Sequence, residues 1–279
     1  MFLKSAASGD DASIYALAMK NTATVFHLTG RYDQALEMYL GALDAFTRLY
    51  GAEDPKTALV MNDVGDLYTM TGDFDKAAGM CENAVVILER TSGTGHPDTA
   101  VAYHGLAGVY YKMGETGKSL SYLNKAAETL EKLLGREHID VSTLYNNMGM
   151  LYSKAGDYDQ ALQVTLESLS ISEALGIADK SGVIPTLCSL GTIYLRMGSA
   201  ENALQMYGKA LDISRRTQDA YHPAGHMIHN NMGMIYEETG DKEKALESYE
   251  RALEIGRVSL GEDHPDVKAT LSNIGRLTG

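Results

Sequence analysis

Residues 144–161 read LYNNMGMLYSKAGDYDQA, and this stretch decides the fold. Its Gly156 belongs to a series of glycines spaced 42 residues apart along the 279-residue chain. The series is Gly30, Gly72, Gly114, Gly156, Gly198 and Gly240. A constant period over nearly the whole chain indicates one supersecondary unit that has been copied and stacked. We therefore expect function on a repeated surface rather than in a single pocket.

Each glycine lies inside the same pattern of small and aromatic residues, with positions counted from the glycine and negative toward the N-terminus. Position −7 is always small: Ala23, Gly65, Ala107, Gly149, Gly191 and Gly233. Position −4 is always aromatic: Phe26, Tyr68, Tyr110, Tyr152, Tyr194 and Tyr236. Positions +5 and +12 hold alanine or serine in every copy. Small residues thus mark both flanks of the glycine.

The apolar spacing on either side of each glycine is helical. Before Gly156 the apolar residues are Leu144, Tyr145, Met148, Leu151 and Tyr152, which share one helix face. We therefore predict two helices per repeat, joined by a tight turn at the glycine. A positive φ at this turn favours glycine, since other residues lose about 1–2 kcal/mol there. The small flanking residues let the paired helices lie close together.

This order of small residue, aromatic ring, turn glycine and alanine resembles the tetratricopeptide repeat. The second aromatic of that motif is kept as Tyr39, Tyr207 and Tyr249 and replaced by Cys81, Leu123 and Thr165. Tetratricopeptide units usually run about 34 residues, and the proline that usually closes their second helix is missing here. We therefore expect each second helix to be about two turns longer than usual.

The connectors between repeats carry a second resemblance. They read Gly93-Thr-Gly-His-Pro97 and Gly261-Glu-Asp-His-Pro265, and the steps Tyr145-Asn-Asn147 and His229-Asn-Asn231 recur on first helices. This combination is similar to the 42-residue subclass of tetratricopeptide repeats found in kinesin light chains. The resemblance covers roughly residues 9–278 and carries more weight for the fold than for any particular protein.

The resemblance implies an all-α fold, a right-handed α–α superhelix of six helix–turn–helix repeats plus a terminal helix. We predict one solenoid over residues 1–279. The sequence stops inside the first helix of a seventh unit. We expect either that the chain is part of a longer protein or that this last helix caps the solenoid. The expected repeats are approximately 11–52, 53–94, 95–136, 137–180, 181–220 and 221–262, with a partial repeat at 263–279.

The position of the connector proline changes between the fourth and fifth repeats. Pro185 arrives four residues later than the other connector prolines predict. Because proline prefers the first turn of a helix, we expect this helix to start about one turn late. The fifth repeat is therefore predicted to be the least regular, either as a bend or as a tolerated loop variation.

Composition limits the classes of partner. The formal net charge is −13, which argues against nucleic acid because a phosphate backbone would be repelled. No signal peptide and no run of 18 apolar residues is found, so we predict a cytosolic protein that does not insert into membranes. Cys81 and Cys188 lie two to three repeats apart and are predicted to be reduced thiols.

The sequence contains no recognisable catalytic or cofactor-binding motif. We therefore predict that the protein is not an enzyme and needs no cofactor. One histidine occurs in each of several connectors: His96, His138, His222 and His264. Stacked helix pairs lie roughly 8–10 Å apart, too far to share a metal ion. We therefore predict a structural or helix-capping role for these histidines.

Candidate binding residues lie on the first helices, which the resemblance places along a concave groove. Position −10 offers Asn62, His104, Asn146 and Asn230, whose amides suit a ligand main chain but could instead bond between helices. Position −2 offers Lys112, Lys154 and Arg196, a positive strip for an acidic peptide or simply solvated helix ends. Tyr111, Met150 and Met234 would supply apolar pockets.

The sequence thus favours a module that binds an extended, acidic peptide of a partner protein, as kinesin light chains bind cargo. A cargo adaptor is one member of this class. The alternatives are a structural spacer or oligomerisation scaffold, with the oligomeric state left open, and a regulatory segment of a larger multidomain protein.

Overall fold

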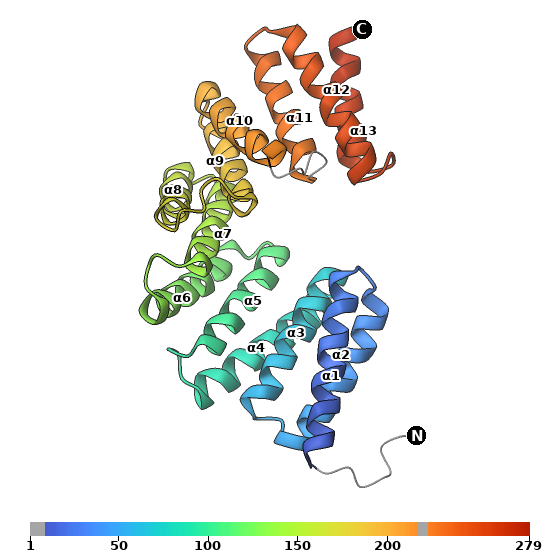
Figure 1. Cartoon of the computed structure of the whole chain (residues 1–279), viewed down its shortest axis with the longest axis vertical. Helices are drawn as coiled ribbons and strands as arrows, with labels where there is room; N and C mark the ends of the chain where they lie inside the picture. Colours follow the sequence, from blue (N-terminus) through green and yellow to red (C-terminus); the bar gives the residue numbers. More distant parts are fainter. Residues whose placement is uncertain (1–8, 217–222) are drawn as a thin grey trace. The chain divides into compact units, whose positions relative to one another are not determined.

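The structure, a computed structural model, describes residues 9–216 and 223–279 (Figure 1). These residues form thirteen α-helices and one 3-10 turn, η1 (Ser181–Val183). The helices are α1 (Gly9–Leu28), α2 (Tyr32–Tyr50), α3 (Pro55–Thr71), α4 (Phe74–Thr91), α5 (Pro97–Met113), α6 (Thr116–Leu134), α7 (Ile139–Ala155), α8 (Tyr158–Ala174), α9 (Ile184–Arg196), α10 (Ala200–Arg216), α11 (Pro223–Glu238), α12 (Lys242–Ser259) and α13 (Pro265–Thr278). The predicted all-α fold of six helix pairs plus a terminal helix is confirmed.

The chain divides into two compact units. Unit 1 is Met1–Arg136 and contains α1 to α6, and unit 2 is Glu137–Gly279 and contains α7 to α13. The single solenoid over residues 1–279 stays a prediction.

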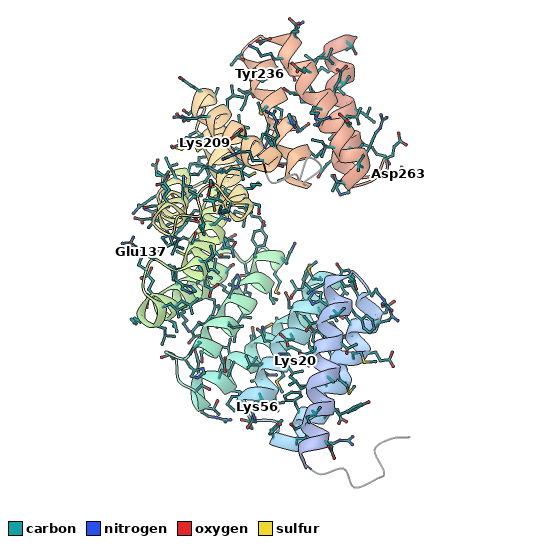
Figure 2. The ribbon with its side chains drawn as sticks, viewed as in Figure 1. Lys20, Lys56, Glu137, Lys209, Tyr236 and Asp263 are labelled. Carbon is teal, nitrogen blue, oxygen red and sulfur yellow. The ribbon has the colours of Figure 1, made fainter. Side chains whose placement is uncertain are left out.

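First helices and second helices occupy separate layers within each unit. Every odd-numbered helix packs on the even-numbered helix that follows it, and α3 also touches α5, as α9 touches α7 and α11. In unit 1, Lys20 Nζ of α1 lies 3.4 Å from Asp63 Oδ2 of α3 (Figure 2). Equivalent positions of the first helices therefore fall on one layer in each unit.

The turn glycines have the backbone that the sequence predicts. Gly72 ends α3 in the left-handed region with φ 84°, and Gly156 ends α7 in the same way with φ 83°. The Gly156 amide donates to the Ser153 carbonyl, and the next amide, of Asp157, donates to Tyr152. The other four turn glycines also have positive φ. The predicted tight turn between paired helices is therefore confirmed.

The two helices of a repeat approach each other most closely at position −7. A Cβ atom built on Gly191 of α9 would lie 2.5 Å from Cε1 of Tyr207 on α10, and one on Gly233 would lie 2.6 Å from the Tyr249 ring. Both rings are fully buried. The Tyr207 hydroxyl is also fixed, 3.0 Å from Thr192 Oγ1 and 2.9 Å from Asn231 Nδ2. The tyrosine rings therefore occupy the space that a side chain at Gly191 or Gly233 would need.

Gly191→Ala is expected to destabilise the protein. The added methyl group would overpack the interface by about 1–3 kcal/mol, more than the gain of up to about 1 kcal/mol from alanine as a helix former. The matched control is Gly208→Ala on α10, where no atom lies within 4 Å of the added Cβ. Chemical denaturation would measure both, and equal or higher stability of Gly191→Ala would contradict the packing account.

Connector residues cap the first helices that follow them. The His96 Nδ1 atom accepts from the Asp98 amide at 3.1 Å, and His138 and His264 accept at 3.2 Å from the amides two residues on. Asp54 fills the same repeat position before α3, where its Oδ1 accepts from the Lys56 amide at 2.8 Å. The capping role is confirmed for these three histidines, whereas His222 lies outside the described residues.

His96→Ala is expected to lower the free energy of unfolding by about 0.5–2 kcal/mol, because the cap acceptor of α5 is lost. His96→Asp should retain most of the stability, since Asp54 already performs this role before α3. Thermal denaturation followed by circular dichroism compares the three proteins. Equal melting temperatures for His96→Ala and the parent would refute the capping contribution.

The fifth repeat is irregular as predicted. Its first helix, α9, has 13 residues where α3, α5 and α7 have 17, and η1 precedes it. Pro185 is the second residue of α9, so proline does occupy the first turn. The late start of this helix is confirmed.

Two further predictions concern second helices and cysteines. Second helices have 17 to 19 residues and run through position +17, for example Glu89 in α4, so their extra length is confirmed.

Cys81 and Cys188 are buried free thiols, and burial raises the pKa of each to about 12. Among the described helices, none is both long and apolar enough to cross a membrane.

Candidate functional site

Asn62 is buried between two first helices of unit 1. Its side chain, 8% exposed, packs against Gly105 of α5, where a glycine leaves room for the amide. The Asn62 Oδ1 atom is buried and has no hydrogen-bond partner among the described residues. A buried acceptor left unpaired costs about 1–3 kcal/mol, so this carbonyl group has unused bonding capacity.

Asn146 of α7 has the same character in unit 2. It is 7% exposed, and its Oδ1 is likewise buried without a partner among the described residues. Asn230 of α11 differs, because its Oδ1 accepts from Thr270 Oγ1 at 3.1 Å and from Asn273 Nδ2 at 3.3 Å. Both donors belong to α13, so Asn230 joins two repeats. Equivalent asparagines therefore have different environments.

The cationic positions lie at the exposed C-terminal ends of first helices. Lys112 lies in the last turn of α5 in unit 1, and its Nζ lies 6.0 Å from the Tyr111 ring centroid. Lys154 and Arg196 are exposed near the ends of α7 and α9 in unit 2. A cation there interacts favourably with the helix dipole, so exposure alone does not assign a ligand.

The remaining predicted binding residues are one exposed histidine, one half-buried tyrosine and two exposed methionines. His104 is exposed on α5, and Tyr111 is half-buried beside Lys112. Met150 and Met234 are 42% and 37% exposed on α7 and α11. Thus Asn62, His104, Tyr111 and Lys112 belong to unit 1. The other six belong to unit 2: Asn146, Met150, Lys154, Arg196, Asn230 and Met234.

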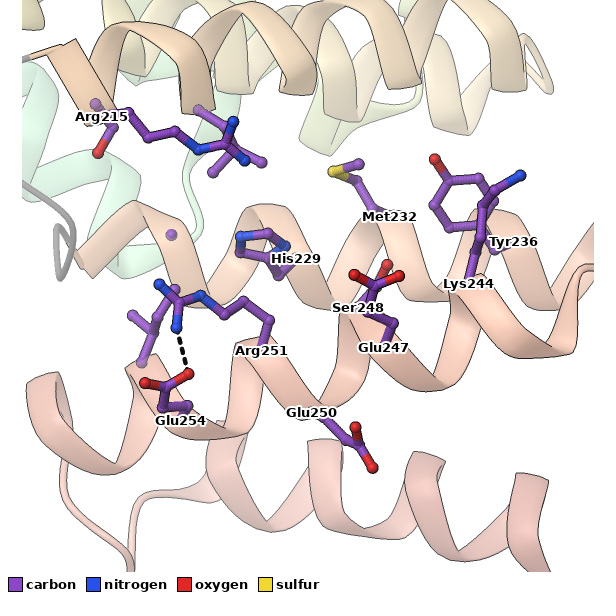
Figure 3. A pocket seen from close by; sticks show the side chains of 14 residues that line it. Arg215, His229, Met232, Tyr236, Lys244, Glu247, Ser248, Glu250, Arg251 and Glu254 are labelled. Carbon is purple, nitrogen blue, oxygen red and sulfur yellow. Dashed lines mark hydrogen bonds and ion pairs between the residues drawn. The ribbon is translucent and has the colours of Figure 1, made fainter.

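The structure also contains a pocket that the sequence did not predict. It lies between α10, α11 and α12 of unit 2 and has a volume of about 550 Å³ (Figure 3). His229 of α11 lies between Arg215 of α10 and Arg251 of α12. Its other linings include Leu211, Met232, Tyr236, Lys244, Glu247 and Glu254. The pocket forms only where two repeats meet, so it could not be predicted from the sequence of single repeats.

The electrostatics of this pocket act on His229. Burial, together with the positive charges of Arg251 and Arg215, lowers the pKa of His229 from 6.5 to about 4. Arg251 forms an ion pair with Glu254 (Figure 3), whereas Arg215 forms no hydrogen bond or ion pair with a described residue. The imidazole is therefore neutral near pH 7, and the positive charges beside it are only partly balanced.

Comparison with known families places this architecture in one class. The tetratricopeptide repeat family matches residues 14–80, 71–132, 98–174, 182–257 and 226–278. The chain therefore belongs to the tetratricopeptide repeat family. Such repeats are scaffolds that generally serve protein interaction and are typically not enzymatic. Comparison with the curated proteins gives no match.

Several solved structures share the fold. BtubC (BKLC) from P. vanneervenii is 22% identical, with a TM-score of 0.69 over 84% of this chain and 94% of that one. The nearly identical TPR-like repeats of a putative kinesin light chain from Podospora anserina are 18% identical, with a TM-score of 0.62 over 74% of this chain and 98% of that one. A STAND ATPase with a tetratricopeptide repeat sensor from Pyrococcus horikoshii is 17% identical, with a TM-score of 0.73 over 94% and 38%. The similarity to kinesin-light-chain-like repeats is confirmed at the level of the fold.

Acidification is expected to destabilise the protein through His229. Below pH 6.5 the unfolded chain takes up a proton at this residue, while the folded protein takes it up only near pH 4. Stability is therefore lost as pH falls through this window. The His229→Leu variant carries the residue found at the same position of the fifth repeat, Leu187. Its free energy of unfolding should therefore fall less on acidification than that of the parent protein. Urea denaturation at about pH 7 and about pH 5 measures the difference, and identical losses in both proteins would contradict the assignment.

Proposed function

We propose that the layer of first helices binds an extended, acidic peptide segment of a partner protein, with the cytosol as the expected location. Each unit would carry its own part of the binding surface. In unit 1 this part is Asn62, His104, Tyr111 and Lys112. In unit 2 it is Asn146, Met150, Lys154, Arg196, Asn230 and Met234.

The observation that carries this proposal is the pair of buried, unpartnered amides on first helices. Asn62 and Asn146 occupy the same repeat position, and the Oδ1 atom of each is buried without a hydrogen-bond partner among the described residues. An asparagine amide both donates and accepts, so it recognises a peptide main chain whatever its sequence. Each such bond would contribute roughly 0.5–1.5 kcal/mol. The Asn230 amide is already engaged, because its Oδ1 accepts from α13 and its Nδ2 donates to Met234 Sδ at 3.9 Å.

Charge gives the preference for acidic ligands. The chain has a net charge of −13, yet Lys112, Lys154 and Arg196 recur at one position of three consecutive first helices. Complementary charge at the rim of a binding surface steers encounter and excludes partners of the wrong sign. The exposed methionines Met150 and Met234 would accept apolar side chains of varied shape.

A cargo adaptor is the particular role that similarity suggests. The Podospora anserina relative is described as a putative kinesin light chain, and it shares the fold and the kind of repeat. We extend this role to the present chain only as one member of the peptide-binding class. A regulatory segment within a larger protein is the other role that a peptide-binding surface would serve.

A structural scaffold is the second candidate function, and the outer face of α1 favours it. Ile14, Val25 and Leu28 are 65%, 58% and 81% exposed there. Apolar surface at the end of a repeat stack promotes self-association or the addition of further repeats. Light scattering across a range of concentrations tests this role, and a monomer at all concentrations would exclude self-association.

Charge reversal on the first helices should abolish the preference for acidic peptides. We expect Lys112→Glu, and separately Lys154→Glu with Arg196→Glu, to weaken binding of a labelled peptide of alternating glutamate and leucine by roughly ten-fold or more. The parent's affinity should fall as salt rises. Fluorescence anisotropy measures both effects.

The matched control reverses exposed cations on second helices. Arg48, Lys76 and Lys118 lie on α2, α4 and α6 and form ion pairs with nearby acids of their own connectors or helices. Lys76 and Lys118 also lie over the rings of Tyr68 and Tyr110, which are not part of the proposed surface. The change of these three cations to glutamate alters the net charge without touching the proposed surface. Peptide affinity that survives the first-helix changes, or falls equally in this control, would overturn the proposal.

A further inference from the structure

The joints between repeats can be compared position by position. A joint is the place where the second helix of one repeat meets both helices of the next. Three repeat positions meet there: +17 on the preceding second helix, −11 on the next first helix and +11 on the next second helix. In unit 1 the joint between α4, α5 and α6 places Glu89, Tyr103 and Lys125 at these positions.

That joint in unit 1 has balanced charges. The Tyr103 hydroxyl donates to Glu89 Oε1 at 2.6 Å, and Lys125 Nζ lies 3.4 Å from the same oxygen. Lys125 Nζ also lies 5.0 Å from the Tyr103 ring centroid. The acid, the phenol and the ammonium group thus satisfy one another. The adjacent pocket, lined by Tyr103 and Lys125, has a volume of only about 230 Å³.

The first joint of unit 2 has the same balance of charge. Glu173 of α8, Leu187 of α9 and Lys209 of α10 fill the three positions, and all three line a pocket of about 220 Å³. Lys209 is labelled in Figure 2. Here too an acid at position +17 faces a lysine at position +11. Both balanced joints fall below the range of about 300–1,000 Å³ typical of ligand pockets.

The second joint of unit 2 breaks this balance. Position +17 is Arg215, position −11 is His229 and position +11 is Arg251. The acid found at this place in the two joints described above is replaced by a guanidinium group, and the pocket here has a volume of about 550 Å³, within the ligand range. Among the described residues only Glu254 pairs with Arg251, and none pairs with Arg215. Arg215 is therefore a guanidinium group without an ion-pair partner among the described residues, and it lies beside His229.

We propose that this pocket binds a carboxylate carried by a small, largely apolar group, with the carboxylate held between Arg215 and Arg251 above His229. The two guanidinium groups approach from α10 and α12, on either side of the imidazole (Figure 3). Leu211 and Met232 line the same space and accept the apolar body. The ligand carboxylate supplies the charge that Glu89 and Glu173 supply in the balanced joints.

Charge also decides between a carboxylate and a phosphate. Arg215, Lys244 and Arg251 line the pocket together with Glu247, Glu250 and Glu254, so the lining carries no net charge and accommodates a monoanion more easily than a dianion. Arg251 pairs with Glu254, and the Glu250 carboxylate points away from α10 (Figure 3), so Arg215 is a cation of the lining without an ion pair among the described residues. A phosphate dianion would leave excess negative charge. Neutral His229 has one N–H group to donate to the carboxylate.

This pocket is separate from the proposed peptide surface. Its walls are α10, α12 and the face of α11 that carries His229, Met232 and Tyr236. Asn230 and Met234 do not line it. Failure of the peptide-binding proposal therefore leaves this inference intact. The carboxylate could belong to a free acid or to the C-terminus of a peptide, and the experiment distinguishes these sources.

The test is calorimetric titration of the full chain with phenylbutyrate, its uncharged amide and inorganic phosphate. We expect the acid to bind with one-to-one stoichiometry, and the amide and phosphate to bind at least ten-fold more weakly. Arg215→Glu restores the residue type of Glu89 and Glu173, so it should fold and should reduce affinity for the acid by roughly ten-fold to a hundred-fold. If its melting curve changes, Arg215→Gln replaces it, with a reduction of about ten-fold expected.

The matched control is Arg216→Glu, which makes the same charge change on the next residue of α10. Arg216 pairs with Asp212 and does not line this pocket, so affinity should be unchanged. Equal binding of the acid and the amide would overturn the proposal. So would tighter binding of phosphate, or equal effects of the changes at Arg215 and Arg216.

The source of the carboxylate is decided with two short apolar peptides that differ only in a free or an amidated C-terminus. Tighter binding of the free-acid peptide than of phenylbutyrate, lost in Arg215→Glu, would assign the pocket to peptide C-termini. Binding of phenylbutyrate alone would assign it to small organic acids. Absence of saturable binding for both the peptide and phenylbutyrate would refute the carboxylate site.

Discussion

The close approach of paired helices at position −7 is the constraint on which the rest of the structure depends. A side chain larger than glycine at Gly191 or Gly233 would enter the ring of Tyr207 or Tyr249. Because these rings are buried and the Tyr207 hydroxyl also bonds to Asn231 of the next repeat, the packing of one repeat fixes the position of its neighbour. Packing within a repeat and packing between repeats are therefore coupled, because the Tyr207 side chain takes part in both.

Joints between repeats tolerate far more variation than the contacts inside a repeat. The same three positions hold an acid, a phenol and an ammonium group in one joint, and two guanidinium groups around an imidazole in another. Side chains at the joint reach solvent at their ends, so charge there is only moderately costly. A repeat protein can therefore gain a binding pocket at one joint while every helix pair keeps its core.

The sequence predicted the parts of the site that depend on local geometry. Turn glycines, histidine caps and the late start of α9 follow from backbone rules that act within a few residues. Asn62, Asn146 and Asn230 could not be separated in this way. Their repeat position is identical, but Gly105 makes room for the first, and Thr270 and Asn273 of α13 bond to the last. These partners lie about one repeat away.

By itself, the sequence determined the period, the helix pairs, their turns and the family, because each repeat is specified by contacts between residues close together in the chain. The tertiary structure alone decided which polar groups remain unpaired and where a pocket opens. His229 is an unremarkable residue of α11 until α10 and α12 bring Arg215 and Arg251 beside it. Desolvation and charge act through space, so only the packed helices reveal them.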